Sequence, residues 1–178
     1  MAIKTIVQSN VVGGNKESDR FLHTTAIPVD SLTEEVKQII QDLKDTLWAY
    51  PFCIGLSAPQ IGYPYAISII NLERESSESS QVLINPKIIS LTGKKDRKRE
   101  SCMSVWGKMG EVERRDKIVL EYRDESYNLR EATYTGFASR AIQHEIDHLL
   151  GILYIDRMLS SSMLLHANFF DEYTIIKG

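Results

Sequence analysis

Hydrophobic residues in the first third of the chain recur with the spacing of an amphipathic helix. They lie three and four residues apart, at Val36, Ile39, Ile40, Leu43 and Leu47. Side chains at this spacing share one face of an α-helix, so the pattern predicts a helix with one face in the core. Ser31 and Glu34 have the spacing of a capping box at its start, and Pro51 is expected to end it. Four charged residues fall largely off the apolar stripe, and we expect them to form a solvated face. They are Glu35, Lys37, Asp42 and Lys44.

Further along the chain, runs of β-branched and alternating apolar residues predict antiparallel strands. The expected strands cover residues 65–72, 81–85, 87–92, 111–122 and 128–134. In the fourth of these, Ile118, Leu120 and Tyr122 alternate and are expected to face inward. The basic run 94–99 is expected to be an exposed turn. Residues 1–29 show few periodic signals and are expected to be irregular, and after residue 157 the pattern leaves helix or strand undecided.

The composition is that of an ordinary globular domain. The chain has 178 residues, of which 43% are hydrophobic and 25% charged, so we expect a single domain over residues 1–178. Helices and antiparallel strands together indicate the α+β class. A net charge of −3 argues against a protein that binds DNA or RNA mainly through the phosphates. No apolar stretch suits a signal peptide or a membrane span, so we expect a cytoplasmic protein.

The clearest chemical pattern is a pair of histidines four residues apart, His144 and His148, with Glu145 between them. Residues four apart lie nearly above one another on a helix, so both imidazoles can bind one metal ion while the carboxylate lies beside them. Gly136 or Ser139 is the expected start of this helix. A catalytic metal site also needs a third protein ligand and an open position for water.

Cys102 is the best candidate for the third ligand. A thiolate binds Zn²⁺ or Fe²⁺ well, and the two cysteines of the chain, Cys53 and Cys102, are expected to be free or metal-bound in a reducing compartment. One protease geometry places a third histidine six residues after the second, but Tyr154 stands there and excludes it. Another geometry would use Glu172, which we disfavour because only six residues follow it.

Three segments, in order along the chain, resemble the motifs of the peptide deformylase family. They are a loop of small residues that ends in glutamine (55–60), a segment around the cysteine (100–104) and the histidine-containing helix (143–151). The third segment matches the family pattern fully, and three motifs at compatible spacing are far more specific than one. The resemblance spans nearly the whole chain. It implies an α+β fold in which antiparallel sheets pack around a metal-binding helix.

The resemblance implies a metal-dependent hydrolase that removes the formyl group from the N-terminal methionine of nascent polypeptides. The implied ligands of one divalent metal ion are Cys102, His144 and His148. The ion is typically Fe²⁺ in this family, with Zn²⁺ or Ni²⁺ as substitutes. Water activated by the metal would attack the formyl carbon, with Glu145 acting as base and then as acid. The side-chain amide of Gln60 and the backbone N–H of Met103 would stabilise the oxyanion.

The family also implies the partner and the residues that bind it. The substrate is an N-formyl-methionyl nascent peptide, whose backbone would pair with Ile54 and Gly55 as an added strand. Phe137 and Ala141 precede His144 by seven and three residues, which puts them on the same side of the helix, where they would form an apolar pocket for methionine. We expect a monomer that contacts the ribosome transiently and binds neither DNA nor membranes.

The sequence departs from the usual residues of the family near the expected groove. Cys53 and Ser101 stand where glycine is usual, Ser57 stands where alanine is usual, and Met103 replaces leucine conservatively. None of these changes removes an implied ligand, the base or Gln60. Ser101 and Cys53 do add side chains where the backbone approaches the substrate. They leave a second hypothesis open, a paralogue that keeps the metal site but has an altered substrate or no deformylase turnover.

Three further positions lie outside these motifs or at their edge. Glu100, with Arg114 or Arg115, is expected either to orient a ligand histidine or to form an ordinary surface ion pair. His23 and His166 are isolated in the sequence. Each is expected to be structural rather than a ligand.

Overall fold

The computed structural model describes residues 2–158 and 164–166. Its helices are α1 (Lys16–Leu22), α2 (Glu34–Ala49) and α3 (Gly136–Leu149), with the 3₁₀ turns η1 (Asn10–Val12), η2 (Ala58–Ile61), η3 (Met103–Val105) and η4 (Tyr154–Arg157). Its strands are β1 (Gly55–Ser57), β2 (Ile67–Ile70), β3 (Gln81–Ser101), β4 (Lys108–Arg123), β5 (Leu129–Thr135) and β6 (Leu165–His166). No helix in the described part of the chain is both long and apolar enough to cross a membrane.

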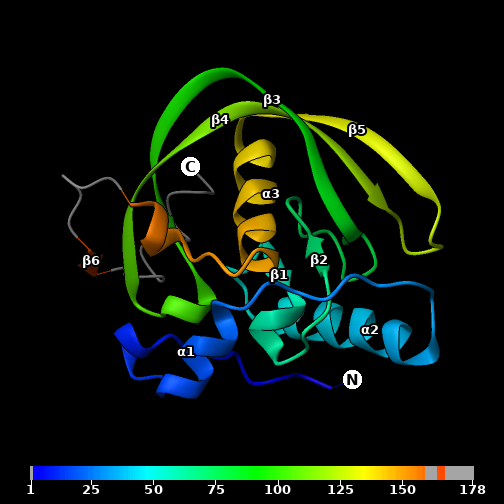
Figure 1. The fold of residues 1–178 in the computed structure, drawn as a ribbon, viewed down its shortest axis with the longest axis horizontal. Helices are drawn as coiled ribbons and strands as arrows, with labels where there is room; N and C mark the ends of the chain where they lie inside the picture. Colours follow the sequence, from blue (N-terminus) through cyan, green and yellow to red (C-terminus); the bar gives the residue numbers. More distant parts are fainter. Residues whose placement is uncertain (1, 159–163, 167–178) are drawn as a thin grey trace.

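The strands form one antiparallel sheet in the order β1-β2-β3-β4-β5, with β6 paired to β4. Helix α3 lies at the centre of the molecule, and β3 and β4 arch over it (Figure 1). Strands β1 and β2 contact α3 and also α2. This arrangement confirms the predicted α+β class, with antiparallel strands packed around the histidine-containing helix.

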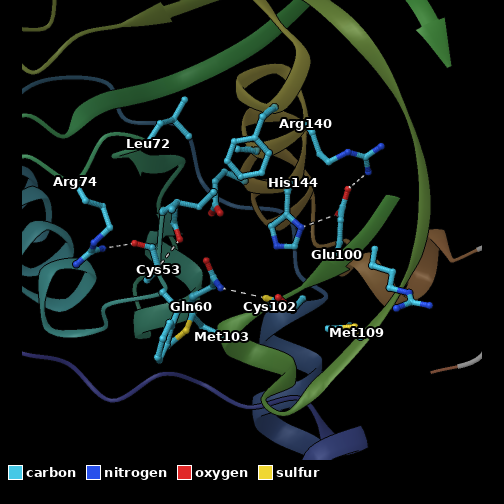
Figure 2. A pocket seen from close by; sticks show the side chains of 18 of the residues that line it. Cys53, Gln60, Leu72, Arg74, Glu100, Cys102, Met103, Met109, Arg140 and His144 are labelled. Atoms are coloured by element: carbon cyan, nitrogen blue, oxygen red, sulfur yellow. Dashed lines mark hydrogen bonds and ion pairs between the residues drawn. The ribbon is translucent and has the colours of Figure 1, made fainter. Parts of the chain in front are cut away.

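The long hairpin of β3 and β4 differs from the prediction. The strands expected over 81–85 and 87–92 and the basic run 94–99 all belong to β3, so the turn predicted at 94–99 is wrong. Gly93, with a φ of +75°, lies at one of three register shifts between β3 and β4, and such bulges bend a hairpin rather than end it. The chain turns at η3 instead, which brings Cys102 close to His144 of α3 (Figure 2).

Helix α2 ends before Pro51 as predicted, but its start and its polar face differ from the prediction. Thr33, not Ser31, caps the helix, and its hydroxyl accepts the N–H of Val36 at 3.2 Å. Asp42 and Lys44, which were expected to be solvated, are 1% and 3% exposed. They are buried because Asp42 accepts a hydrogen bond from Tyr63 at 2.8 Å and Lys44 lies 2.9 Å from a carboxylate oxygen of Glu125.

The segment 1–29, which was expected to be irregular, contains α1. Asn15 caps this helix by accepting the N–H of Ser18 at 2.8 Å. Its one buried residue, Leu22, packs in a cluster with Cys102 and Tyr154. A short helix with a single buried apolar residue shows too little periodicity to be recognised from sequence.

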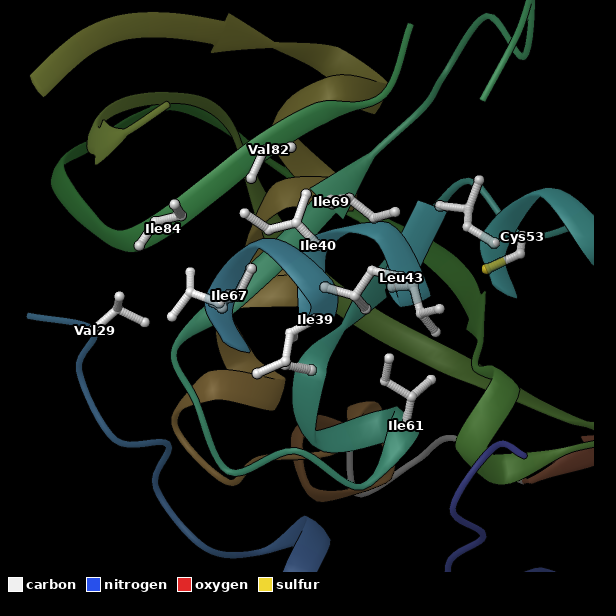
Figure 3. Close-up of a cluster of buried hydrophobic side chains, with 14 of the residues drawn as sticks. Val29, Ile39, Ile40, Leu43, Cys53, Ile61, Ile67, Ile69, Val82 and Ile84 are labelled. Atoms are coloured by element: carbon white, nitrogen blue, oxygen red, sulfur yellow. The ribbon is translucent and has the colours of Figure 1, made fainter. Parts of the chain in front are cut away.

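Two larger clusters of buried apolar side chains hold α2 and α3 in place. The apolar stripe of α2 packs on β1, β2 and the start of β3, as Figure 3 shows for Ile39, Ile40 and Leu43. The apolar face of α3 packs on β2, β3 and β4 through Ile142 and Ile146. In β4, Ile118, Leu120 and Tyr122 are buried as predicted. With its apolar face held by the sheet, α3 directs its histidines toward the turn that carries Cys102.

Candidate functional site

Helix α3 carries five of the predicted site residues, which are Phe137, Ala141, His144, Glu145 and His148. The helix begins at Gly136, one of the two predicted starts, where the backbone takes a φ of +57°. Glu145 and His148 are 4% and 1% exposed, and the side chain of His144 is 12% exposed. The structure therefore presents these three polar side chains to the interior of the protein rather than to solvent.

The three predicted metal ligands come together in the structure. One ligand atom from each of Cys102, His144 and His148 lies within 4.8 Å of the others. The Sγ atom of Cys102 is 3.2 Å from Nε2 of His148. The sulfur also accepts the backbone N–H of Ser104 and the side-chain N–H of Gln60, each at 3.4 Å. Both donors stabilise a thiolate at this position.

The chemistry of these donors fits a divalent metal ion. Burial acts to lower the pKa of His144, but hydrogen bonds with Cys102 and Glu100 outweigh it and raise that pKa well above its usual value. Burial and the neighbouring His144 hold the pKa of His148 well below its usual value, so this imidazole is neutral. One sulfur and two imidazoles whose ligand atoms lie this close together form a ligand set for a divalent transition metal.

Glu100 fixes the orientation of His144. Its Oε2 atom lies 3.0 Å from Nδ1 of His144 and accepts that proton, so Nε2 is the nitrogen that faces Cys102. Arg114 donates two hydrogen bonds to the same carboxylate, at 2.7 and 2.8 Å, and Arg140 donates a third at 2.6 Å. The partner of Glu100 is therefore Arg114, whereas Arg115 donates to the backbone carbonyl of Gly93. The structure shows a buried network, so the alternative of a surface ion pair is wrong.

The carboxylate of Glu145 lies against β1. Its Oε2 accepts the hydroxyl of Ser57 at 2.6 Å. A Cβ atom on Gly55 would lie only 2.6 Å from Oε1, so a larger residue here would displace the Glu145 carboxylate. Burial raises the pKa of Glu145 above its usual value.

Gln60 lies in η2 and is 1% exposed. Its Oε1 atom accepts the backbone N–H of Ser57 at 2.9 Å. This contact fixes the amide so that Nε2 points to Cys102 and to the hydroxyl of Ser104, each 3.4 Å away. The carbonyl of Met103 accepts the side chain of Gln8 at 2.9 Å, which holds η3 in place.

A cavity of about 650 Å³ opens beside these groups. The predicted site residues in its lining are Ile54, Gly55, Gln60, Cys102, Met103, Phe137, Ala141, His144 and Glu145. His148 is the one predicted ligand that does not line it, and this residue is 1% exposed. Phe137 is 55% exposed, while Ala141 is 8% exposed and also belongs to the core.

Several lining residues were not recognised in the sequence. Arg140 precedes His144 by four residues and shares its helix face. This spacing could have identified it as a residue of the site. Leu72, Glu73 and Arg74 follow β2 in a loop, and no pattern in the sequence identifies them as site residues.

Cys53 was singled out in the sequence because it stands near the expected groove. Its side chain packs in the core beside α2, and its thiol donates to the carbonyl of Gly55 at 3.0 Å. Burial raises the pKa of that thiol.

The fold and the site indicate a class of protein: a metal-dependent hydrolase in which two histidines of one helix, with a buried carboxylate between them, could hold a divalent ion together with a cysteine. The chain matches the family model of polypeptide deformylase over residues 15–163. It is 35% identical over 147 residues to the peptide deformylase of Chlorobaculum parvum, a match that covers 81% of this chain and 78% of that protein.

Solved structures give the same result. The peptide deformylase of Legionella pneumophila superposes with a TM-score of 0.78 at 30% identity, covering 89% of this chain and 88% of that one. That of Synechococcus elongatus, solved in complex with actinonin, superposes with a TM-score of 0.78 at 32% identity, covering 90% and 82%. The chain belongs to the polypeptide deformylase family and is an enzyme that works with a divalent metal ion.

Proposed function

We propose that this chain removes the formyl group from N-formyl-methionyl nascent peptides and that Glu145 moves the proton in this reaction. The observation that carries the proposal is the position of the Glu145 carboxylate. It is buried, it lines the same cavity as Cys102 and Gln60, and one of its oxygens is already bound by Ser57. A protein that only bound a metal or a peptide would have no need of such a group.

Cys102, His144 and His148 would hold the metal ion, for which we propose Fe²⁺, with Zn²⁺ or Ni²⁺ as substitutes. A thiolate with two imidazoles suits all three ions. When bound, the ion polarises the formyl group and activates water for attack near neutral pH. His144 is kept in place for this role by Glu100, whose carboxylate accepts its Nδ1 proton.

Glu145 would take the proton of the attacking water and then deliver it to the nitrogen of the leaving amine. Water adds to the formyl carbon, the C–N bond breaks, and formate and a free N-terminal amine result. A carboxyl group whose pKa is raised by burial is closer to neutral pH and can serve as base and then as acid. The side-chain amide of Gln60 and the backbone N–H of Met103 would donate to the oxygen on which charge develops. Each such donor is typically worth about 3 kcal/mol.

The peptide would pair with the backbone of Ile54 and Gly55. Strand β1 stands at one end of the strand order in the described part of the sheet, and such an edge accepts an added strand. Phe137, Ala141 and Met103 line the cavity and would enclose the methionine side chain. Because the substrate emerges from the ribosome, we also propose a cytoplasmic monomer that contacts the ribosome transiently.

The proposal is tested by anaerobic purification, metal analysis and an assay of amine release from a formyl-Met peptide. The iron form of the parent chain is expected to release amine. Glu145→Gln should keep its metal and lose about a hundredfold or more in kcat, the range for a general base. An iron-loaded parent chain that releases no amine would instead support the paralogue without deformylase turnover.

The metal ligands are tested separately. Cys102→Ala should bind less than stoichiometric metal after dialysis, because two imidazoles alone form an incomplete site. Full retention of metal by this variant would contradict its role and direct attention to Glu172, which lies outside the described residues.

A further inference from the structure

The hydroxyl of Ser57 contacts the proposed base directly. Ser57 is the last residue of β1 and is 0% exposed. Its Oγ atom lies 2.6 Å from Oε2 of Glu145 and 3.1 Å from the backbone oxygen of the same residue. A hydroxyl has one proton to donate, and the shorter distance together with the negative charge favours the carboxylate.

The two oxygens of Glu145 have different surroundings. Gly55 and Glu145 line the cavity, whereas Ser57 does not, so Oε2 is bound from behind the cavity wall. Oε1 lies against Gly55, where an added Cβ would be only 2.6 Å away. The carboxylate is therefore held between a hydroxyl on one side and a bare backbone on the other.

Ser57 also holds Gln60, through a different atom. Its backbone N–H donates to Oε1 of Gln60 at 2.9 Å. Replacing the side chain of Ser57 by a methyl group removes the contact with Glu145 and leaves this backbone contact in place. The two links can therefore be separated by a single substitution.

We propose that Ser57 is a positioning residue for the reaction, a role that rests on the proposed function of Glu145. Its hydroxyl binds Oε2 and fixes the carboxylate, so that Oε1 is the oxygen that takes and returns the proton. Ser57→Ala removes only a buried hydroxyl and keeps the backbone contact with Gln60, so this variant should fold.

Ser68 offers a matched control. It is the partner of Ser57 across β1 and β2 and is also 0% exposed. Its hydroxyl has no hydrogen-bond partner within the described residues. Ser68→Ala therefore removes a buried hydroxyl from the neighbouring strand without touching the site.

The test compares kcat, KM, metal content and melting temperature for the two variants in their iron forms. Ser57→Ala should lose about tenfold in kcat, with KM and metal content unchanged, because the loss of a hydrogen bond to a charged group misplaces a reacting atom. Ser68→Ala should match the parent chain in kcat and KM. A crystal structure of Ser57→Ala should show the Glu145 side chain moved from its place beside Gly55 while His144 stays.

Three outcomes would overturn the inference. A kcat for Ser57→Ala equal to that of Ser68→Ala would show that the hydroxyl does not act in the reaction. A loss confined to KM or to metal content would show a merely structural role. If Glu145→Gln retains full activity, the proposed base is wrong and the role of Ser57 falls with it; if Glu145→Gln is inactive and Ser57→Ala is not impaired, only the positioning role is wrong.

Discussion

Glu100 connects the candidate metal centre to the rest of the protein. Its carboxylate is 7% exposed and accepts hydrogen bonds from His144, Arg114 and Arg140. Burial acts to raise the pKa of Glu100, but the hydrogen bonds from Arg114 and His144 outweigh it and hold the pKa far below its usual value. The residue is therefore ionised at neutral pH.

Replacing Glu100 by glutamine keeps the shape of the side chain and removes its charge. We expect the affinity for metal to fall by about ten- to a hundredfold, the usual cost when the partner of a ligand histidine is lost. The free energy of unfolding should fall by roughly 3 kcal/mol, because two buried arginines lose their charged partner. Competition with a chelator and denaturant unfolding of the metal-free protein measure the two effects.

Glu113→Gln is the matched control on the same hairpin. Glu113 pairs with Lys95 and Arg97 at the surface, at 2.5 and 3.2 Å, and surface ion pairs contribute little to stability. Its substitution should leave the metal affinity unchanged. Equal metal affinity in both variants would show that His144 needs no carboxylate partner.

At the residue scale, sequence reasoning finds side chains whose chemistry is tied to a local spacing. His144, Glu145 and His148 follow one helical repeat, so their proximity is visible in the sequence. The contact of Ser57 with Glu145 joins residues 88 positions apart, and nothing in the local pattern reports it. The sequence could not decide whether Arg114 or Arg115 pairs with Glu100, because that depends on the register of β3 and β4.

At the scale of elements, Arg74 connects the end of α2 to the start of the proposed peptide groove. Its guanidinium donates to the backbone carbonyls of Leu47 and Trp48, at 3.3 and 3.2 Å, and also to that of Cys53. It lies over the ring of Trp48, 5.1 Å from the centroid. A cation at this position satisfies carbonyls that a helix end leaves free and interacts favourably with the helix dipole.

Arg74→Met should loosen the segment that leads from α2 into β1. We expect the free energy of unfolding to fall by about 1–2 kcal/mol, the contribution of hydrogen bonds from a charged group. KM for a formyl-Met peptide should rise by about two- to tenfold with a smaller change in kcat, because Ile54 and Gly55 are the proposed pairing residues.

The comparison for Arg74 is Arg130→Met. Arg130 is exposed on β5 and pairs with Asp124 at 2.7 Å. Steady-state kinetics and thermal unfolding should show little change for this variant. An unchanged KM for Arg74→Met would contradict the link between the end of α2 and the groove.

Elements were predictable where a single repeat governs many residues. The apolar stripe of α2, the histidine spacing of α3 and the alternation in β4 gave the right element types. The length of β3 was not predicted. Its proline, its glycine and its basic run are residue types that usually end strands, so the sequence indicated two short strands and a turn. In the structure, pairing with β4 across three register shifts overrides those local signals.

At the scale of the whole molecule, Asp42 connects three distant parts of the chain. It accepts hydrogen bonds from Tyr63 and Gln38, at 2.8 and 2.9 Å, and lies 3.1 Å from the ammonium group of Lys4. The N-terminal segment, α2 and the loop after η2 therefore meet at one buried carboxylate. Burial acts to raise the pKa of Asp42, but these partners outweigh it and lower the pKa below its usual value.

The sign of this shift predicts a pH dependence of stability. A carboxylate whose pKa is lower in the folded than in the unfolded protein stabilises the fold above its unfolded pKa of about 3.9, and this contribution is lost as the pH falls through the folded value. Asp42→Asn should therefore be less stable than the parent chain at neutral pH, and the difference should shrink below about pH 4.

Urea unfolding of the metal-free protein at several pH values tests this dependence. Glu35→Gln, at an exposed position on the same helix, serves as the control and should show a pH dependence like that of the parent chain. A stability difference for Asp42→Asn that stays constant between neutral pH and about pH 3 would contradict the assignment.

The α+β class and the family could be predicted from composition, periodicity and three motifs. The curvature that closes the sheet over α3 could not be predicted, because it arises from register shifts between β3 and β4 and not from the residues of either strand alone. The burial of Asp42 and Lys44 could not be predicted either, since Tyr63 and Glu125, which bind them, lie in distant loops.

Strand β1 has one further consequence, for how the protein avoids pairing with the wrong chains. A long exposed sheet edge recruits strands from other molecules and promotes aggregation. β1 has only three residues and is followed at once by η2, in which Pro59 has no N–H to donate. An edge this short can form only a few hydrogen bonds. In the proposed pairing with a newly made chain, such an edge would hold the first residues of that chain without becoming a template for a growing sheet.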